Sequence, residues 1–310
     1  MDSKISSRPP LNEDQRAVKG SQFKPSMAGR HGFDRAFEIA AWTATGIAVA
    51  ILAWLLLTIL IDGLGTLNWN FITSYPSRRP GRAGVVAALA GTLWLMAVVA
   101  AVSFPVGVGA GIYLEEFSSD NWFTRIVEIN IGNLAGVPSI IYGLLGLAVF
   151  VRVLEPITGG RSVLSGALTL SLLILPVIIV STREALRAVP DSMRLAGYAL
   201  GANRWQVVWS HVLPAAMPGI LTGVILALSR AIGETAPLIA IGAASFISFV
   251  PNGLDSQFTA LPIQIYNWVG RPQEEFHHIA ASGIIVLMTV LLMMNAIAIY
   301  LRNRFQKELP

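Results

Sequence analysis

The sequence predicts an all-α polytopic membrane protein, and three observations lead to this class. Of its 310 residues 54% are hydrophobic and only 13% are charged, which is too apolar for a water-soluble chain of this length. The apolar residues are gathered into long runs without any charge. Each run is long enough for a helix to cross about 30 Å of hydrocarbon. The clearest runs are residues 39–61, 83–114, 129–151, 162–182 and 279–301.

Residues 1–38 precede the first run and differ from it in composition. They carry lysine and arginine among serine, proline and glycine, which predicts a disordered basic tail. A secretory signal would place a shorter apolar segment much nearer the start of the chain. The first run is therefore predicted to stay as an anchor. Residues 39–310 then form the membrane domain, with a core at about 83–301.

The number of spans depends on the apolar region 218–251, which Arg230 and Glu234 interrupt. It forms either one long helix or two segments. With six spans, most of the 22 lysine and arginine residues fall in the tail, in loops 115–128 and 183–218, and at the C-terminus, which places both termini in the cytoplasm. A seventh span would weaken this asymmetry. We therefore expect six spans and a broken or re-entrant piece after Glu234, which requires protein or a cavity around it.

The loop between the fourth and fifth spans, residues 190–214, reads as two short helices around a glycine, and we call it the elbow segment. Asp191 or Ser192 is predicted to cap the first helix, and Gly201 suits a left-handed stop at its end. Pro214 is predicted to close the second helix.

The second helix of the elbow segment begins with a predicted capping box, formed by Asn203 and Gln206. Helical spacing gives it one apolar face, made of Trp205, Val208, Trp209 and Val212. The pattern alone fits two structures equally well: an amphipathic hairpin on the bilayer surface, or a knob that docks on a partner protein.

A resemblance favours the docking knob. The elbow segment is similar to the cytoplasmic loop of the membrane subunits of ABC importers, which in that family is a coupling helix seated on a cytoplasmic ATPase. The matching residues are Ala196, Gly197, Gly201, Leu213 and Pro214. The glutamate that usually leads the motif is Leu195 here, and His211 replaces an aliphatic residue, so one polar contact of the family is missing.

Two further stretches narrow the resemblance. Gly-Val-Pro-Ser-Ile-Ile-Tyr-Gly-Leu-Leu-Gly at 136–146 and Ser-Arg-Ala-Ile-Gly-Glu-Thr-Ala-Pro-Leu at 229–238 resemble membrane subunits of the bacterial phosphate-specific ABC importer, most of all its A-type permease subunits. The likeness covers roughly residues 39–301. It implies six helices with a coupling helix, a second permease subunit of the C type, two ATP-binding subunits, and a phosphate-binding protein outside the cytoplasmic membrane.

The first stretch also has a physical interpretation of its own. Gly136, Gly143 and Gly146 are predicted to let helices approach closely, because packing holds helices together in lipid. Pro138 removes a backbone hydrogen bond and Ser139 can partly replace it, which predicts a kinked third span. Pro138 and Ser139 either serve this packing or line the substrate route.

Arg230 and Glu234 are the main candidate site residues, because a charge at the centre of a spanning helix costs about 2.5–3.5 kcal/mol and must face protein or water. Spaced four apart, the two side chains can meet on one helix face. They form either a structural ion pair or an oxyanion site on the guanidinium. The resemblance favours the second alternative and places Arg230, Glu234 and the adjacent Thr235 on the translocation route.

Several function classes are excluded. The chain has no cysteine, hence no disulfide or thiolate site. The adjacent histidines His277 and His278 point apart on a helix, so neither a metal nor a cofactor is expected. No phosphate-cradling Gly-x4-Gly-Lys-Ser/Thr loop occurs, so the chain is not expected to be an ATP-hydrolysing enzyme. Nucleic acid is not expected as a partner. The acidic residues of loop 115–128 are interpreted as a solvated linker; they are Glu115, Glu116, Asp120 and Glu128.

The expected function is therefore that of a permease subunit that carries inorganic phosphate across the bacterial cytoplasmic membrane. Two alternatives stay open. Arginine recognises other oxyanions in the same way, which leaves phosphonate, sulfate and molybdate as substrates. A stand-alone anion channel or carrier could also use Arg230 and Glu234, as a filter or relay.

Overall fold

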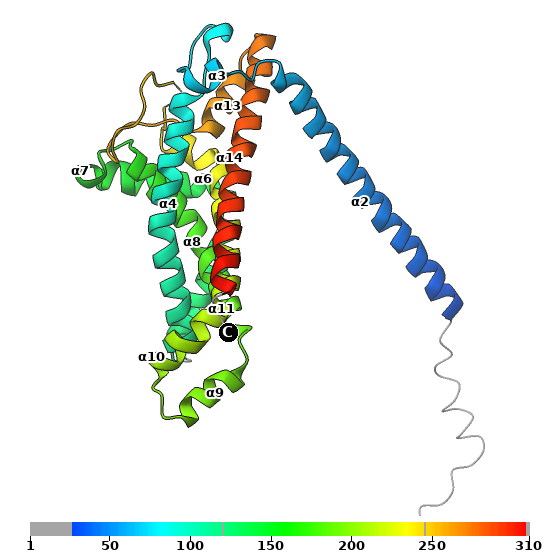
Figure 1. The fold of residues 1–310 in the computed structure, drawn as a ribbon, viewed down its shortest axis with the longest axis vertical. Coiled ribbons are helices and arrows are strands. Elements are labelled where there is room, and N and C mark those ends of the chain that lie inside the picture. Colours follow the sequence, from blue (N-terminus) through cyan, green and yellow to red (C-terminus); the bar gives the residue numbers. More distant parts are fainter. Residues whose placement is uncertain (1–26, 120, 245, 308–310) are drawn as a thin grey trace, which may run out of the picture. The chain divides into compact units, whose positions relative to one another are not determined.

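The computed structural model describes residues 27–119, 121–244 and 246–307, and every regular element within these residues is helical (Figure 1). Five of the described helices are long and apolar enough to cross a membrane, and a bent pair makes a sixth span if it is counted as one. The chain divides into two compact units, Met1–Leu57 and Thr58–Pro310. The prediction of an all-α protein with six spans is confirmed in this sense.

The first helix, α2 (Met27–Leu64), begins before the first apolar run. Residues 1–26 of the predicted tail lie outside the described residues. For residues 27–38 the prediction of disorder is wrong, because they are helical. Pro25 is the last proline before α2, so nothing stops a helix nucleated in the apolar run from growing back to Met27.

The second unit contains the remaining helices. Its long and medium α-helices are α4 (Val86–Ile112), α5 (Trp122–Leu134), α6 (Ser139–Gly146), α8 (Val163–Arg187), α9 (Asp191–Ala199), α11 (Leu213–Gly233), α13 (Leu261–Val269) and α14 (Glu274–Lys307). Its short helices are α3 (Trp69–Thr73), η1 (Pro80–Arg82), α7 (Glu155–Thr158), α10 (Arg204–Val207) and α12 (Ala236–Ala240). Three π-helical turns extend longer helices: η2 (Tyr113–Phe117), η3 (Leu147–Val153) and η4 (Val208–Val212).

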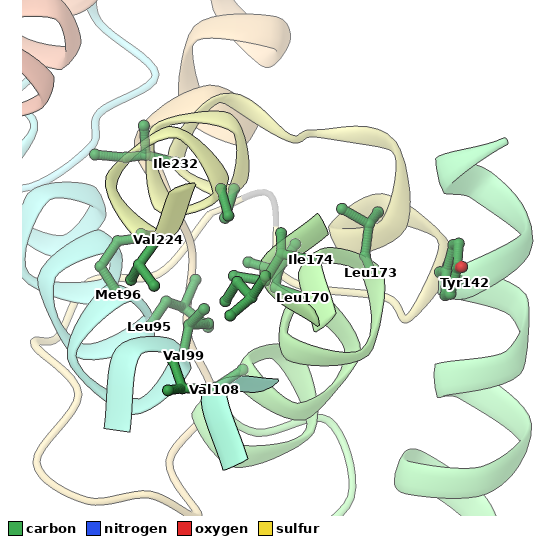
Figure 2. Close-up of a cluster of buried hydrophobic side chains, with 14 of the residues drawn as sticks. Leu95, Met96, Val99, Val108, Tyr142, Leu170, Leu173, Ile174, Val224 and Ile232 are labelled. Carbon is green, nitrogen blue, oxygen red and sulfur yellow. The ribbon is translucent and has the colours of Figure 1, made fainter. Parts of the chain in front are cut away.

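Helix α8 is the centre of this unit. Its spanning window is 67% buried, against 44% for α4 and 6% for α14. Leu170 and Ile174 of α8 meet Leu95 and Val99 of α4 in the main hydrophobic cluster, to which α11 adds Val224 (Figure 2). Because α8 is surrounded by protein, its two neighbours α4 and α11 are held in fixed register against it.

Glycines on both neighbours allow this close approach to α8. A Cβ atom added at Gly107 or Gly111 of α4 would lie 2.6 Å from Ile178 or 2.7 Å from Thr182. On α11 an added Cβ at Gly219 would lie 2.8 Å from Ala185, and one at Gly223 would collide with Ser181. Both pairs are spaced four apart, the small-xxx-small pattern by which helices pack in lipid. Neither pair was predicted from the sequence, although the Gly-x-x-x-Gly spacing is visible there.

The third predicted span is not one kinked helix, and this expectation is wrong. Helix α5 and the α6–η3 helix meet at an angle of 106°. Pro138 precedes α6 with an extended ψ of 135°, so the helix stops and restarts. Proline lacks the N–H that would continue a helix, and it also pushes the residue before it out of the helical region. The Tyr142 hydroxyl donates a 2.7 Å hydrogen bond to the Leu134 carbonyl, which ties the two helices across the break.

Two of the three glycines predicted to mediate packing do so. A Cβ atom at Gly146 would collide with Thr169 of α8, and one at Gly143 would lie 2.6 Å from Ala240 of α12. Gly136 lies in the break, where an added Cβ would meet only the carbonyl of Asn133 at 3.5 Å. Its predicted role in helix packing is therefore wrong.

A glycine-to-alanine pair within α4 tests how strictly packing fixes this fold. A Cβ at Gly91 would collide with the backbone carbonyl of Thr259, which cannot rotate away, whereas one at Gly109 meets nothing within 4 Å. Gly91→Ala should destabilise the protein by about 1–3 kcal/mol, the usual cost of overpacking. Gly109→Ala should be neutral or slightly stabilising, because alanine favours the helix. Thermal unfolding in detergent measures both, and equal midpoints would contradict the packing.

Candidate functional site

The apolar region around Arg230 is broken into two pieces, as expected. Helix α11 ends at Gly233, Glu234 follows with an extended ψ of 117°, and Thr235 precedes the short helix α12. The hydroxyl of Thr235 lies 3.5 Å from the Gly233 carbonyl, a long contact that leaves it largely available. The break therefore presents backbone and side-chain polar groups at the end of a spanning helix.

Arg230 and Glu234 form an ion pair across this break. Nε of Arg230 donates to Oε1 of Glu234 at 3.3 Å. The Arg230 side chain is 48% exposed, whereas that of Glu234 is 18% exposed. The carboxylate thus holds the guanidinium from the protein side. A guanidinium has five N–H donors, so Arg230 retains donors that can bind an oxyanion.

The two signature stretches of the sequence meet in space. An added Cβ at Gly143 would lie 2.6 Å from Cα of Pro237, directly after the break. Ser139 lies one turn before Gly143 on the same face of α6 and is half-buried. The structure thus brings the face that carries Ser139 to the helix that follows Glu234 and Thr235. Pro138 is exposed and serves as the N-cap residue of α6.

The elbow segment turns where the sequence indicated. Helix α9 ends at Ala199, and Gly201 adopts a left-handed φ of 82°. The N–H groups of Gly201 and Ala202 donate to the carbonyls of Tyr198 and Gly197, which is a Schellman motif. The predicted cap at Asp191 or Ser192 is wrong, because Pro190 occupies the N-cap position and no side chain caps the helix.

The predicted motif residues of the elbow segment divide between its interior and its surface. Gly197 is buried, and an added Cβ there would lie 2.7 Å from Val207 of the second helix. Leu213 is buried as well, and Pro214 is half-buried. Ala196 and Leu195 are exposed, Leu195 by 65%, and the neighbouring Leu200 is 88% exposed. The outer surface of α9 is thus apolar and open.

The second helix of the elbow segment begins with the predicted capping box but does not end at Pro214. Asn203 and Gln206 exchange hydrogen bonds of 2.9 Å. The π-turn η4 then lets the Leu213 N–H reach the Val208 carbonyl, and the helix passes Pro214 without a break. Residues Arg204–Gly233 consequently form one 30-residue helix that leads from the elbow to Arg230.

The apolar face predicted on this helix is also divided in the structure. Val208 and Val212 are buried, whereas Trp205 and Trp209 are more than half exposed. The two indole rings stack with centroids 5.6 Å apart. Helical spacing alone could not show that the two valines of this face would be buried in the protein while the two tryptophans would be exposed.

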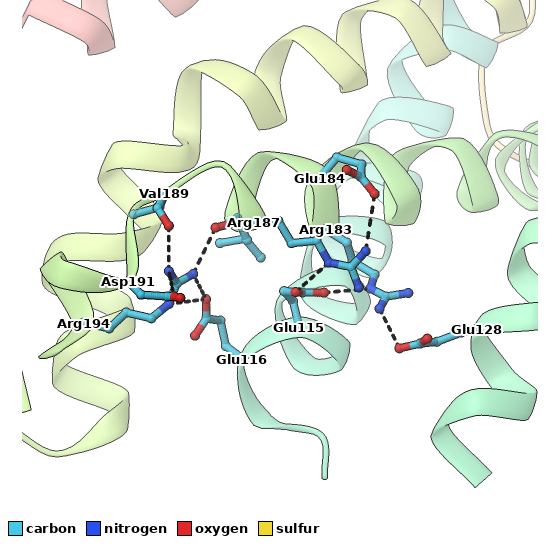
Figure 3. A network of polar contacts seen from close by, with 10 residues as sticks. Glu115, Glu116, Glu128, Arg183, Glu184, Arg187, Val189, Asp191 and Arg194 are labelled. Carbon is cyan, nitrogen blue, oxygen red and sulfur yellow. Dashed lines mark hydrogen bonds and ion pairs between the residues drawn. The ribbon is translucent and has the colours of Figure 1, made fainter. Parts of the chain in front are cut away.

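The acidic loop is not a solvated linker, and that interpretation is wrong for its described residues; Asp120 lies outside them. Glu116, on the π-turn η2, is only 4% exposed and pairs with Arg194 of α9 at 2.6 Å (Figure 3). Glu115 pairs with Arg183 and Arg187 of α8, at 3.1 and 2.8 Å. The hydrogen bond that Arg194 donates to the Glu116 carboxylate raises the pKa of Arg194, so this arginine keeps its charge.

Glu128 of α5 joins the same cluster through Arg183, at 2.5 Å. Four elements thereby meet at the end of α4 nearest the elbow segment. The sequence shows four acidic residues in loop 115–128 and three arginines in 183–194, and these numbers do not specify which residues pair. No group of three metal-binding side chains occurs in the part of the chain that the structure describes.

Comparison with known proteins identifies the family. Residues 103–307 match the sequence model of the family described as binding-protein-dependent transport system inner membrane component. The chain belongs to this family. Its multi-pass inner membrane character and its role as a transport component follow from that membership. The alternative of a stand-alone channel or carrier is thereby set aside, since the family is one component of a larger transport system.

Individual relatives agree with the family. The chain is 32% identical to the phosphate transport system permease protein PstA of Yersinia pestis, over 80% of this chain and 82% of that protein. It is 33% identical to PstA of Mycobacterium leprae, over 85% and 86%. The fold resembles a bacterial alginate ABC transporter crystallised with its periplasmic protein, at a TM-score of 0.64 and 15% identity, over 89% of this chain and 98% of that one.

The elbow of this family member can be tested at Gly201. A β-branched residue in the left-handed conformation is strained by roughly 1–2 kcal/mol, whereas asparagine tolerates it. Gly201→Val should leave membrane insertion intact but lower transport per ATP hydrolysed by roughly tenfold, since 1.4 kcal/mol is a factor of ten. Gly201→Asn should retain most of the transport per ATP hydrolysed. Paired transport and ATPase assays on the reconstituted system measure the ratio, and full transport by the valine variant would exclude the elbow from coupling.

Proposed function

We propose that this chain is the A-type permease subunit of an ATP-driven importer of inorganic phosphate. Its relatives of similar length are named phosphate transport system permeases, which supports this substrate. A C-type permease subunit would complete the route, two ATP-binding subunits would act on the elbow segment, and an extracytoplasmic binding protein would deliver phosphate. Both termini and the elbow segment would lie in the cytoplasm, as the distribution of basic residues favours.

The half-exposed guanidinium of Arg230 at the helix break carries this proposal. Phosphate is a multivalent oxyanion, and a planar guanidinium binds it through two parallel hydrogen bonds. Glu234 holds Nε of Arg230 and leaves the other donors to the substrate. Its own charge prevents the site from holding an anion too tightly, because a conducting site must also release its ligand.

The 30-residue helix Arg204–Gly233 explains how ATP hydrolysis would reach this site. It begins in the elbow segment and ends at the break beside Arg230. At 1.5 Å per residue it spans about 45 Å. A helix of this length transmits a displacement of its first turn to its last, so closure of the ATPases beneath α9 would move Arg230 between the two sides of the membrane.

Uptake by membrane vesicles tests the substrate. Vesicles with all subunits, ATP and the binding protein should accumulate radiolabelled phosphate, and vesicles that lack only this chain should not. Excess sulfate, molybdate or phosphonate should leave phosphate uptake unchanged. Accumulation of one of these anions in place of phosphate would overturn the proposed substrate, and uptake without the ATP-binding subunits would overturn the importer.

Arg230→Lys tests the role of the guanidinium. Lysine keeps the charge and can still pair with Glu234, but it loses bidentate contact. A hydrogen bond between charged groups contributes about 1.5–3 kcal/mol, so phosphate uptake should fall roughly tenfold or more. Arg125→Lys, an exposed arginine on α5, is the control and should transport normally. Unchanged uptake by Arg230→Lys would reduce Arg230 to a charge-balancing partner of Glu234.

A further inference from the structure

The ion pair between Glu116 and Arg194 is the most enclosed charged contact of the described residues. The two side chains are 5% and 16% exposed. Nη2 of Arg194 lies 2.6 Å from Oε1 of Glu116 and also donates to the carbonyl of Leu186 at 2.9 Å. Nη1 donates to the carbonyl of Val189 at 2.8 Å. Arg194 therefore joins α9 to the last turn of α8 as well as to η2 at the end of α4.

This arrangement is more than a pair of surface charges. A buried charge that loses its partner is left unpaired in a poorly solvated place, whereas an exposed one is taken over by water. Arg194 has one partner of each kind. Its partner Glu116 is buried, whereas its second partner, Asp191 at 3.2 Å, has a side chain that is 91% exposed. The contact with Glu116 accordingly fixes the position of α9, and the contact with Asp191 adds little.

The adjacent carboxylates Glu115 and Glu116 hold different elements. Glu115 pairs with Arg183 and Arg187 on α8, and Glu116 pairs with Arg194 on α9. The π-turn η2 that carries both carboxylates continues directly from α4. A displacement of α9 therefore cannot be absorbed by the loop between α8 and α9 alone, because Arg194 passes it to α4.

We infer that Glu116 and Arg194 are positioning residues that lock the elbow helix α9 to the end of the α4–α8 pair. A force on the exposed face of α9, around Leu195 and Leu200, then moves α4 and α8 together with the Arg204–Gly233 helix. Without this lock, α9 would tilt under the force and the bundle would stay behind. This inference rests on the proposed function for the source of the force, an ATPase subunit that binds α9.

Charge removal and charge reversal in the assembled transporter test the lock. Glu116→Gln keeps the shape of the side chain and removes its charge, and Arg194→Lys keeps the charge but cannot reach Glu116 and both carbonyls at once. Each should lower phosphate uptake per ATP hydrolysed about tenfold while ATP hydrolysis continues. The reversed pair Glu116→Arg with Arg194→Glu should recover a substantial part of the ratio. Glu155→Gln, on the exposed surface of α7, is the control for removing a carboxylate.

A merely structural role would give a different result. Loss of fold or assembly would lower uptake and ATP hydrolysis in proportion, and the reversed pair would not recover the ratio. Either outcome overturns the inference, as does an unchanged ratio in Glu116→Gln.

Hydrogen exchange separates this inference from the proposed function, since it needs neither ATP nor phosphate. In the purified transporter the amides of 191–199 should exchange at least tenfold faster in Glu116→Gln than in the natural chain, and the reversed pair should slow them again. Unchanged exchange would overturn the lock. If the natural chain transports no phosphate but α9 loosens as expected, the proposed substrate fails and the lock stands.

Discussion

Close packing of helices on α8 is the constraint on which the rest of the structure depends. In lipid the hydrophobic effect does not drive helices together, so contact between them relies on close fit and on polar contacts. Gly107 and Gly111 of α4 and Gly219 and Gly223 of α11 bring both helices against α8. Gly146 brings α6 to the same helix, and Gly143 brings α6 to α12. The site at Arg230 is thus held by a chain of glycine contacts that starts at α8.

The interruptions of the helices matter as much as their packing. Proline at Pro138 ends a helix, but proline at Pro214 does not, although both remove the same backbone donor. At Pro214 the π-turn η4 supplies the carbonyl of Val208 to the Leu213 N–H just before the proline, and the helix continues. As a result the elbow segment and the helix break share one rigid helix. The break itself is placed where Glu234 can leave the helix and still reach Arg230.

Much of the fold and of the candidate site is present in the sequence, because it depends on local interactions. The apolar runs, the left-handed Gly201, the capping box of Asn203 and Gln206, and the spacing of Arg230 and Glu234 all concern residues a few positions apart. The break near Glu234 was also predicted, since a seventh span would have weakened the asymmetry of the basic residues. The resemblance to a family of importer subunits added the docking role of the elbow.

The sequence by itself thus determined that helices span a membrane, that the chain turns at Gly201, and that the charges of Arg230 and Glu234 need a partner or a cavity. Only the tertiary structure decided which partner each charge takes. Glu116 and Arg194 are separated by 78 residues in the sequence. The sequence of an acidic loop does not show whether water or arginine side chains surround its carboxylates. Local patterns involve residues a few positions apart. Burial of a charged side chain depends on contacts with distant parts of the chain, and for Glu116 and Arg194 these contacts form only when α4, α5, α8 and α9 pack together.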